Sequence, residues 1–278
     1  GVQRAPMWAA GEGVPTRYIR AAAWSTVGWM EHLAAIELHP SLSLAKDSGR
    51  PTMMVFDLDP GPPADIVQCA QVGMWLREIF EHVGLQSFPK TSGSKGLQIY
   101  VPLNTPTRYE ATKPFAHALA RLLEDQHREL VVSDMKKELR KGKVLVDWSQ
   151  NDQHKTTIGV YSLRAREHPT VSTTVKWEEV EHMLKKKDPG LLVFEADQVL
   201  KRVGKMGDLL EPVLTLKQKL PQLVVDGGTG APARAASKAR GSSTVAGTGL
   251  KIAAQAGGQK KAVKPGNKKA AGKKSRKI

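Results

Sequence analysis

Cysteine is almost absent from this chain, with Cys69 the only one among 278 residues. A single cysteine cannot form a disulfide within one chain, which excludes the disulfide-stapled folds of small secreted proteins. Long hydrophobic runs are also missing, since no stretch approaches the roughly 18 consecutive apolar residues that a membrane helix needs. The start of the chain shows no basic-then-apolar secretory pattern. We therefore predict a soluble, cytoplasmic protein.

Acidic residues are scarce near the end of the chain. Between Val225 and Ile278 there are 13 Lys and Arg but one acid, Asp226, so this segment carries most of the net charge of +15. It has almost no large apolar side chains, so burial cannot offset the entropy of ordering it. We predict that residues 225–278 form a disordered Lys/Ala/Gly-rich tail that attracts nucleic acid in a salt-dependent way. The alternative is a solubilising tail without a partner.

The remaining residues, 1–224, are numerous enough for one globular domain with a sizeable core. Short apolar segments predict strands at 52–58, 96–103, 143–148 and 158–163. Apolar residues at helical spacing predict helices at 64–83, 110–129 and around 177–184. The segment at 96–103 alternates apolar and polar residues, as a strand with one polar face would. The expected fold class is α/β, with a mixed sheet in an α+β arrangement and no internal repeat.

Two aspartates follow the apolar run of the first predicted strand, in MVFDLDPGPP. Asp57 and Asp59 are two residues apart, so on a strand they project from the same face. Two ionised carboxylates about 4 Å apart repel by roughly 4 kcal/mol at an effective dielectric of 20. Protonation, contact with water or basic groups, or a divalent cation must offset that repulsion. The prolines that follow predict a strand end at the sheet rim, although an ordinary turn at Asp59 is the plainer interpretation of this motif alone.

A third aspartate, Asp147, ends another apolar segment, KVLVDW. Three strand-end carboxylates supply the hard oxygen ligands that Mg²⁺ or Mn²⁺ needs in a two-metal phosphoryl-transfer site. Asp134 and Asp152 have turn-like or helix-like neighbours, and we interpret them as surface residues.

A small-residue loop, TSGSKG, precedes the second predicted strand. Its glycines and serines let backbone amides approach an anion, and Lys95 adds a charge. The loop lacks the Walker A spacing. Two basic segments, 136–143 and 161–167, follow and contain Arg140 and Arg164. Beside three acids, these groups predict a nucleoside triphosphate site.

Four motifs, FDLDPG, TSGSKGL, GKVLVDWSQN and KTTIGVYSLRAR, stand in an order and spacing that identify a family resemblance. From about Thr16 to Gln222 the chain resembles the polymerase domain attached to bacterial ATP-dependent DNA ligase D. It is equally similar to the stand-alone relatives of that domain in the archaeo-eukaryotic primase superfamily. The resemblance implies a primase-polymerase core. Its implied activity is that of a nucleotidyltransferase that adds nucleotides, often ribonucleotides, to primer ends or gaps in double-strand-break repair by non-homologous end joining.

The resemblance also implies the roles of individual residues. Asp57, Asp59 and Asp147 would hold two Mn²⁺ or Mg²⁺ ions, with Asp147 also helping to activate the primer 3′-hydroxyl. The residues implied to hold the incoming nucleotide are Ser92, Lys95, Arg140 and Arg164, with His39 close to it. Implied partners are DNA with a primer end or gap, nucleoside triphosphates, a DNA repair ligase and an end-binding protein, in a cytoplasmic, nucleoid-associated setting without a membrane.

Two features depart from the family pattern. Gln98 stands where the family usually has histidine, and a glutamine amide cannot carry a charge, so weaker triphosphate binding or an altered pH dependence is expected. Family members also have several dozen residues before the segment that begins here with GVQRAPMW. If the protein truly begins at Gly1, we expect recognition of a downstream 5′-phosphate to be impaired and apolar surface to be exposed.

Two other functions fit parts of the sequence. A phosphatase of the haloacid dehalogenase type also places Asp-x-Asp after an apolar strand, but Pro60 and Gly61 stand where its motif usually continues Gly-Thr. A non-catalytic relative that binds nucleic acid through its basic tail is the second alternative, favoured by Gln98 and opposed by the intact aspartates.

Overall fold

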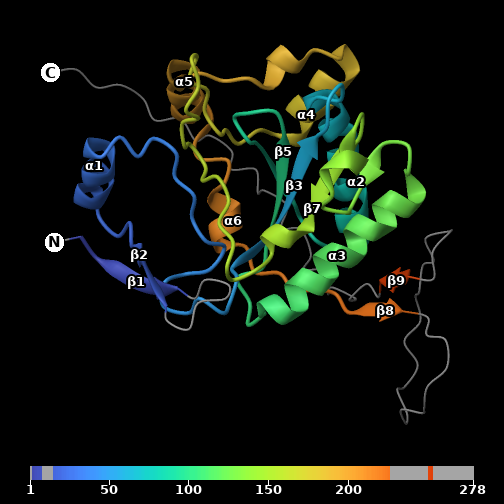
Figure 1. Cartoon of the computed structure of the whole chain (residues 1–278), viewed down its shortest axis with the longest axis horizontal. Helices are drawn as coiled ribbons and strands as arrows, with labels where there is room; N and C mark the ends of the chain where they lie inside the picture. The colour runs from blue at the N-terminus through green and yellow to red at the C-terminus, as the bar shows by residue number, and fades with distance from the viewer. Residues whose placement is uncertain (1, 8–14, 226–249, 253–278) are drawn as a thin grey trace, which may run out of the picture.

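The computed structural model describes residues 2–7, 15–225 and 250–252 (Figure 1). Almost all of the predicted disordered tail therefore lies outside the described residues, and its division from the domain at residue 224 stays a prediction. Two short strands, β8 (Leu223–Val225) and β9 (Leu250–Ile252), pair with each other in an antiparallel manner.

A mixed five-stranded sheet forms the centre of the fold, in the strand order β4-β5-β3-β7-β6. Its central strand, β3 (Met53–Pro60), is antiparallel to both β5 (Leu97–Pro102) and β7 (Val144–Asp147). At the edges, β4 (Phe88–Thr91) is antiparallel to β5, and β6 (Val131–Val132) is parallel to β7. The predicted α/β class with a mixed sheet is confirmed.

Two long helices, α2 (Ile66–His82) and α3 (Tyr109–Gln126), pack on one face of this sheet (Figure 1). Asp65 begins α2 by accepting a hydrogen bond from the Val67 N–H, and Gln68 completes a capping box. The shared core consists of alternate residues of β3 and apolar residues of both helices: Met54, Phe56, Leu58, Val72, Leu76, Phe80, Phe115, Leu119 and Leu123. Each such fully buried side chain stabilises the fold by about 1.5–3 kcal/mol.

The opposite face of the sheet is also largely covered. A second apolar cluster there joins the strands to the short helix α6 (Glu211–Thr215) and consists of Leu42, Val55, Tyr100, Tyr109, Leu210 and Val213. The polar face predicted for β5 is therefore buried and not open to solvent: Gln98 is 1% exposed and Tyr100 4% exposed. The Gln98 amide donates to the Thr157 hydroxyl, and the Tyr100 hydroxyl donates to the Ile158 carbonyl. Residues 157 and 158 therefore cover this part of the strand.

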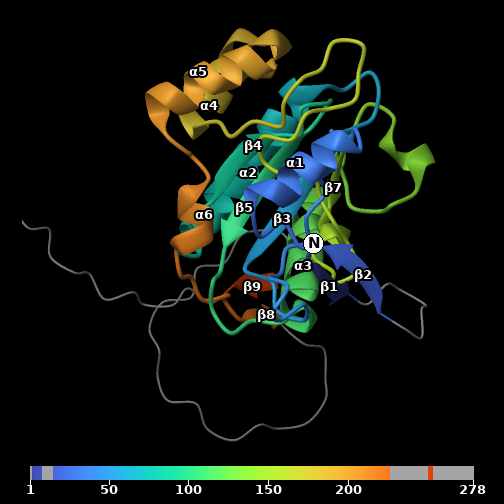
Figure 2. The same cartoon turned by 90° about the vertical axis from the view of Figure 1, so that its left-hand side faces the viewer.

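The N-terminal part of the chain lies on the side of the sheet opposite to α2 and α3 (Figures 1 and 2). It consists of an antiparallel ribbon of β1 (Arg4–Met7) and β2 (Thr16–Ile19), followed by helix α1 (Trp24–His32). On α1, Trp24 is 89% exposed.

The predicted strand at 158–163 does not form. Tyr161 has a left-handed backbone with φ of 62°, which interrupts an extended chain, and only one isolated bridge joins Leu163 to Val171. Further along the chain lie α4 (Trp177–Lys186), the 3₁₀ turn η3 (Pro189–Leu192) and α5 (Ala196–Met206). No helix in the described ranges has the length and apolar character needed to cross a bilayer.

Asn151 is a buried residue that supports the central strand. Its Oδ1 accepts a hydrogen bond from the Val55 N–H at 3.0 Å, and its Nδ2 donates to the Val55 carbonyl at 2.7 Å. The ladder between β3 and β7 ends at Asp57 and Asp147. The Asn151 amide therefore takes the place of a strand partner for Val55.

Replacing Asn151 by alanine is expected to lower the free energy of unfolding by about 2–4 kcal/mol, because two buried backbone groups lose their partner. Urea denaturation measures this change. The control is Gln153→Ala, a change at a partly exposed residue whose amide contacts the neighbouring His154 ring, and it is expected to stay within about 0.5 kcal/mol of the unmodified protein. Equal stability of the two variants would contradict the assignment.

Candidate active site

Four polar side chains form a row across the sheet. In the register of the strands, Lys90 on β4 lies opposite Gln98 on β5, Gln98 lies opposite Asp57 on β3, and Asp57 lies opposite Asp147 on β7. Directly opposed residues project from the same face, so these four side chains, here called the polar row, lie together on the face away from α2. Asp59 shares that face because it is two residues from Asp57.

The aspartates are placed deeper in the sheet than the sequence predicted. Strand β3 continues to Pro60, so Asp57 lies within the central strand between two neighbours and not at the rim. Asp57 is half-buried, and Asp59, nearer the strand end, is exposed. Asp147 is the last residue of β7, as expected.

The three carboxylates influence one another electrostatically. Burial, followed by the nearby charge of Asp59, raises the pKa of Asp57 to about 7, although a hydrogen bond from Gln98 opposes the rise. Asp59 keeps some exposed surface, but the protein around its carboxylate displaces water, and this desolvation together with the charge of Asp147 raises the pKa of Asp59, while Arg140 and Arg164 act to lower it. Like charges held together in this way favour either a bound proton or a bound cation.

The donor set suits a divalent cation in part. The Oδ1 atom of Asp57 is buried and has no hydrogen-bond partner, and carboxylate oxygens are the ligands that Mg²⁺ and Mn²⁺ prefer. Asp147 is engaged differently: its Oδ1 accepts from the Ser149 N–H and hydroxyl, and its Oδ2 from the Gln150 amide. These bonds cap the 3₁₀ turn η2 (Trp148–Gln150).

Within the described residues, no three His, Cys, Asp or Glu side chains already form a group able to hold a metal ion. The capping bonds of Asp147 give a physical reason, because both of its oxygens are directed to the turn and not shared with the other two acids. The assignment of Asp57, Asp59 and Asp147 as metal ligands therefore stays a prediction.

The small-residue loop at 92–96 is held in a tight conformation at the end of β3. The Ser92 hydroxyl oxygen accepts hydrogen bonds from the Ser94 and Gly96 N–H groups at 3.2 and 3.1 Å. Gly93 has a φ of 67°, and a Cβ atom on Gly96 would lie 2.3 Å from the Leu58 carbonyl oxygen. Both glycines are therefore required by the fold, and Lys95 is left exposed at the tip.

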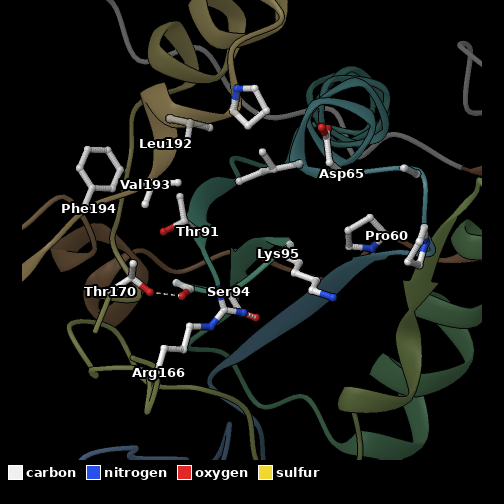
Figure 3. A pocket seen from close by; sticks show the side chains of 16 residues that line it. Pro60, Asp65, Thr91, Ser94, Lys95, Arg166, Thr170, Leu192, Val193 and Phe194 are labelled. Carbon is white, nitrogen blue, oxygen red and sulfur yellow. Dashed lines mark hydrogen bonds between the residues drawn. The ribbon is translucent and has the colours of Figure 1, made fainter. Parts of the chain in front are cut away.

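A pocket of about 360 Å³ lies beside this loop (Figure 3). Ser94, Lys95 and Arg166 border it, and the Arg166 guanidinium donates a hydrogen bond to the Ser94 hydroxyl. The rest of its lining is mainly apolar and includes Pro60, Leu192, Val193 and Phe194. None of the three aspartates lines the pocket, so it is separate from the polar row.

Glu37 connects two of the predicted nucleotide-binding residues. Its Oε1 lies 3.5 Å from the Arg164 Nε, and its Oε2 lies 3.2 Å from the His39 Nε2. A hydrogen bond from the Ala165 N–H is the main cause that keeps the pKa of Glu37 below its ordinary value. The structure thus brings His39 and Arg164 together. Glu37 itself was not predicted, although it lies in the same IELHP segment as His39.

Arg140 lies close enough to the acids to act on one of them. It belongs to the 3₁₀ turn η1 (Lys137–Arg140), and its guanidinium donates to the Met135 carbonyl at 2.6 Å. Its charge acts on the pKa of Asp59, as does that of Arg164. The charges of two predicted phosphate-binding arginines therefore act on the same carboxylate.

Lys90 is the residue of the polar row that sequence reasoning missed. It has no exposed surface, and its ammonium donates to the Ser172 hydroxyl and to the Ile158 carbonyl. Burial lowers the pKa of Lys90 to about 7, while the charge of Asp57 acts in the opposite direction. The sequence places Lys90 two residues before the 92–96 loop, which could have drawn attention to it. Its position on the same face as Gln98 becomes visible only when the register of β4 against β5 is known.

Residues 2–210 match the family model described as LigD, primase-polymerase domain. The chain is 42% identical over 193 residues to the multifunctional non-homologous end joining DNA repair protein LigD of Mycobacterium tuberculosis (strain H37Rv), covering 66% of this chain and 25% of that protein. It is 34% identical over 184 residues to the bifunctional non-homologous end joining protein LigD of Bacillus subtilis (strain 168), covering 66% and 29%. The chain thus spans between a quarter and a third of these relatives' length.

A solved structure is also similar. The polymerase domain from Mycobacterium tuberculosis ligase D in complex with DNA superimposes with a TM-score of 0.69 and 38% sequence identity. The match covers 78% of this chain and 76% of that one.

Proposed function

Because the chain belongs to the LigD primase-polymerase family, we propose that it is a nucleotidyltransferase of non-homologous end joining that adds nucleotides, in particular ribonucleotides, to DNA primer ends or gaps. This membership excludes the haloacid dehalogenase phosphatase considered from the sequence. The observation that supports the proposal best is the placement of Asp57, Asp59 and Asp147 on one sheet face beside the 92–96 loop.

The aspartates and arginines of the site would have different roles in nucleotidyl transfer. Asp57, Asp59 and Asp147 would hold two Mn²⁺ or Mg²⁺ ions, which when bound neutralise phosphate charge and polarise the reacting oxygens. Arg140 and Arg164, whose charges both act on Asp59, would bind the phosphates of the incoming nucleotide. Asp147 would also assist deprotonation of the primer 3′-hydroxyl, a task that needs a carboxylate in a fixed position. The hydrogen bonds from Ser149 and Gln150 fix it in this way.

The loop residues contribute hydrogen bonds and charge. A hydroxyl whose oxygen accepts two backbone N–H groups still has its own proton to donate, so Ser92 can bind a phosphate oxygen. Lys95 is exposed and can approach the same phosphates, and His39 lies beside Arg164 through Glu37. DNA would be the macromolecular partner, and a repair ligase and an end-binding protein would complete the pathway.

Primer extension tests the proposal. The unmodified chain should extend a recessed or gapped DNA primer with Mn²⁺ and ribonucleoside triphosphates. Asp59→Asn should lower the rate by about 1,000-fold, which corresponds to roughly 4 kcal/mol of lost transition-state stabilisation. Asp125→Asn is the matched control, because Asp125 lies on α3 in an ion pair with Arg128 away from the site. Equal extension by Asp59→Asn and the control would refute the proposal.

A non-catalytic nucleic-acid-binding relative is the second candidate. It is favoured by the position of Gln98, whose amide donates to Asp57 and Thr157 and so has no N–H left for a phosphate. Nucleotide affinity that does not depend on a metal, together with loss of DNA binding on removal of residues 225–278, would select this candidate.

A further inference from the structure

We propose that Gln98 is a positioning residue for Asp57: it holds one carboxylate oxygen, Oδ2, and thereby presents the other, Oδ1, to a divalent cation. The inference rests on the proposed function and assigns to Gln98 a task within the same site.

The geometry fixes Gln98 on several sides. It is 1% exposed and lies directly opposite Asp57 in the register of β5 and β3. Its Nε2 donates to Asp57 Oδ2 at 2.9 Å and to the Thr157 hydroxyl at 2.8 Å, and its Oε1 accepts from the Tyr100 hydroxyl at 3.4 Å. With both amide protons engaged, the side chain cannot also serve as a phosphate donor.

The orientation of the amide follows from these partners. If the amide were turned over, Oε1 would face a carboxylate oxygen, and two acceptors would repel each other. The arrangement with Nε2 toward Asp57 satisfies Oδ2, and the Thr157 and Tyr100 hydroxyls keep the amide in place. Gln98 therefore restrains rotation of the Asp57 carboxylate.

The second carboxylate oxygen of Asp57, Oδ1, has a different environment. Asp57 Oδ1 is buried without a hydrogen-bond partner among the described residues. An unsatisfied buried polar atom costs about 1–3 kcal/mol, and more when it is charged. A carboxylate with one oxygen held by an amide and the other left open in this way is a one-oxygen ligand for a hard cation.

The expected magnitude comes from the behaviour of outer-shell partners in metal sites. Hydrogen-bond partners that orient a ligand typically contribute 10–100-fold to metal affinity. Gln98 is such a partner for Asp57, so its loss should weaken metal binding without removing any ligand atom.

Mn²⁺ titration of the whole chain, without nucleotide or DNA, tests the inference by calorimetry. Gln98→Met keeps the size of the side chain and removes both donors, and its affinity for Mn²⁺ should fall about tenfold or more. Gln218→Met is the matched control: Gln218 is also buried, but its Nε2 donates only to the Gln86 and Pro102 carbonyls. Its Mn²⁺ affinity should stay within about twofold of the unmodified chain. A folded Gln98→Met that binds Mn²⁺ as tightly as Gln218→Met overturns the inference.

A second measurement needs no variant at Gln98. In NMR spectra of the unmodified chain, the side-chain amide resonances of Gln98 should shift as diamagnetic Mg²⁺ is added. The shift should level off when the metal site is saturated. Unchanged resonances at saturating Mg²⁺ overturn the inference even if Gln98→Met fails to fold.

Asp57→Asn separates this inference from the proposed function. If Asp57→Asn loses Mn²⁺ binding and Gln98→Met does not, the metal site stands and only the positioning by Gln98 is refuted. If the unmodified chain and Asp57→Asn bind Mn²⁺ equally, both the metal site and the inference are refuted.

Discussion

Asp57→Asn should make the metal-free protein more stable at alkaline pH while removing its affinity for Mn²⁺. The pKa of Asp57 is raised from 3.8 to about 7. The native state therefore holds a proton that the unfolded state has already released, and the free energy of unfolding falls as the pH rises from about 4 through 7. The full loss, on the order of 2–4 kcal/mol, is present above about pH 8. Asparagine cannot ionise, so the variant avoids this loss.

Urea denaturation in the presence of a chelator measures the effect. The stability difference between Asp57→Asn and the unmodified protein should grow as the pH rises from about 5 to 8. The pH range separates this effect from that of Lys90, whose pKa is lowered to about 7 and which acts in the other direction: Lys90 stabilises the native state as the pH rises from about 7 toward 10.5. A variant that is less stable than the unmodified protein across this range would contradict the prediction.

Mn²⁺ provides the complementary measurement. A ligand that binds only the native state stabilises it, by about 2.7 kcal/mol at a hundredfold excess over its dissociation constant. The unmodified protein should gain stability on addition of Mn²⁺, and Asp57→Asn should not. Asp125→Asn, the exposed control on α3, should behave like the unmodified protein.

Gly61→Ala is expected to displace Arg140 from the candidate active site. A Cβ atom at this position would lie 1.9 Å from the Arg140 carbonyl oxygen and 2.6 Å from its carbonyl carbon. These are backbone atoms, which cannot rotate away as a side chain can. The Gly61 N–H also donates to the Lys143 carbonyl at 2.8 Å, so the segment that carries Arg140 is built directly on this glycine.

The variant should lose about 2–4 kcal/mol of stability through overpacking and displaced backbone hydrogen bonds. Metal-dependent nucleotide affinity should fall as well, because Arg140 would be moved from Asp59. Urea denaturation and nucleotide titration measure the two effects. Gly204→Ala on α5, where an added Cβ meets nothing within 4 Å, is the control and should be neutral or slightly stabilising. Equal stability of the two alanine variants would refute the packing argument.

The long elements of the fold could be predicted from sequence because their periodicity is strong. Strands β3, β5 and β7 and helices α2, α3 and α4 lie within a few residues of the predicted ranges. The short strands β4 and β6 were missed because two to four residues are too few to show alternation. The segment at 158–163 alternates like a strand, yet the left-handed backbone at Tyr161 prevents one, and no alternation pattern reveals that conformation.

The site could be predicted only in part, for a related reason. The common face of Asp57 and Asp59 follows from spacing along one strand, so the sequence reveals it. The polar row depends on the register between four strands, which is a tertiary property. Gln98 stood out as a departure from the family motif, but its bond to Asp57 required the register of β5 against β3. The bonds that turn Asp147 toward its own turn were likewise invisible in the sequence.

Lys90 sits beneath a cover of backbone that is not part of a regular sheet. The outer edge of β4 is bound by residues 173–175, through the pairs Thr91 N–H to Thr173 carbonyl and Val175 N–H to Pro89 carbonyl, and the ammonium has no accessible surface. An amine-reactive reagent can therefore acylate the exposed lysines directly, whereas it can acylate Lys90 only after local opening of the structure exposes the ammonium. The rate at which this one amine becomes modified therefore reports how often the packing around Lys90 opens.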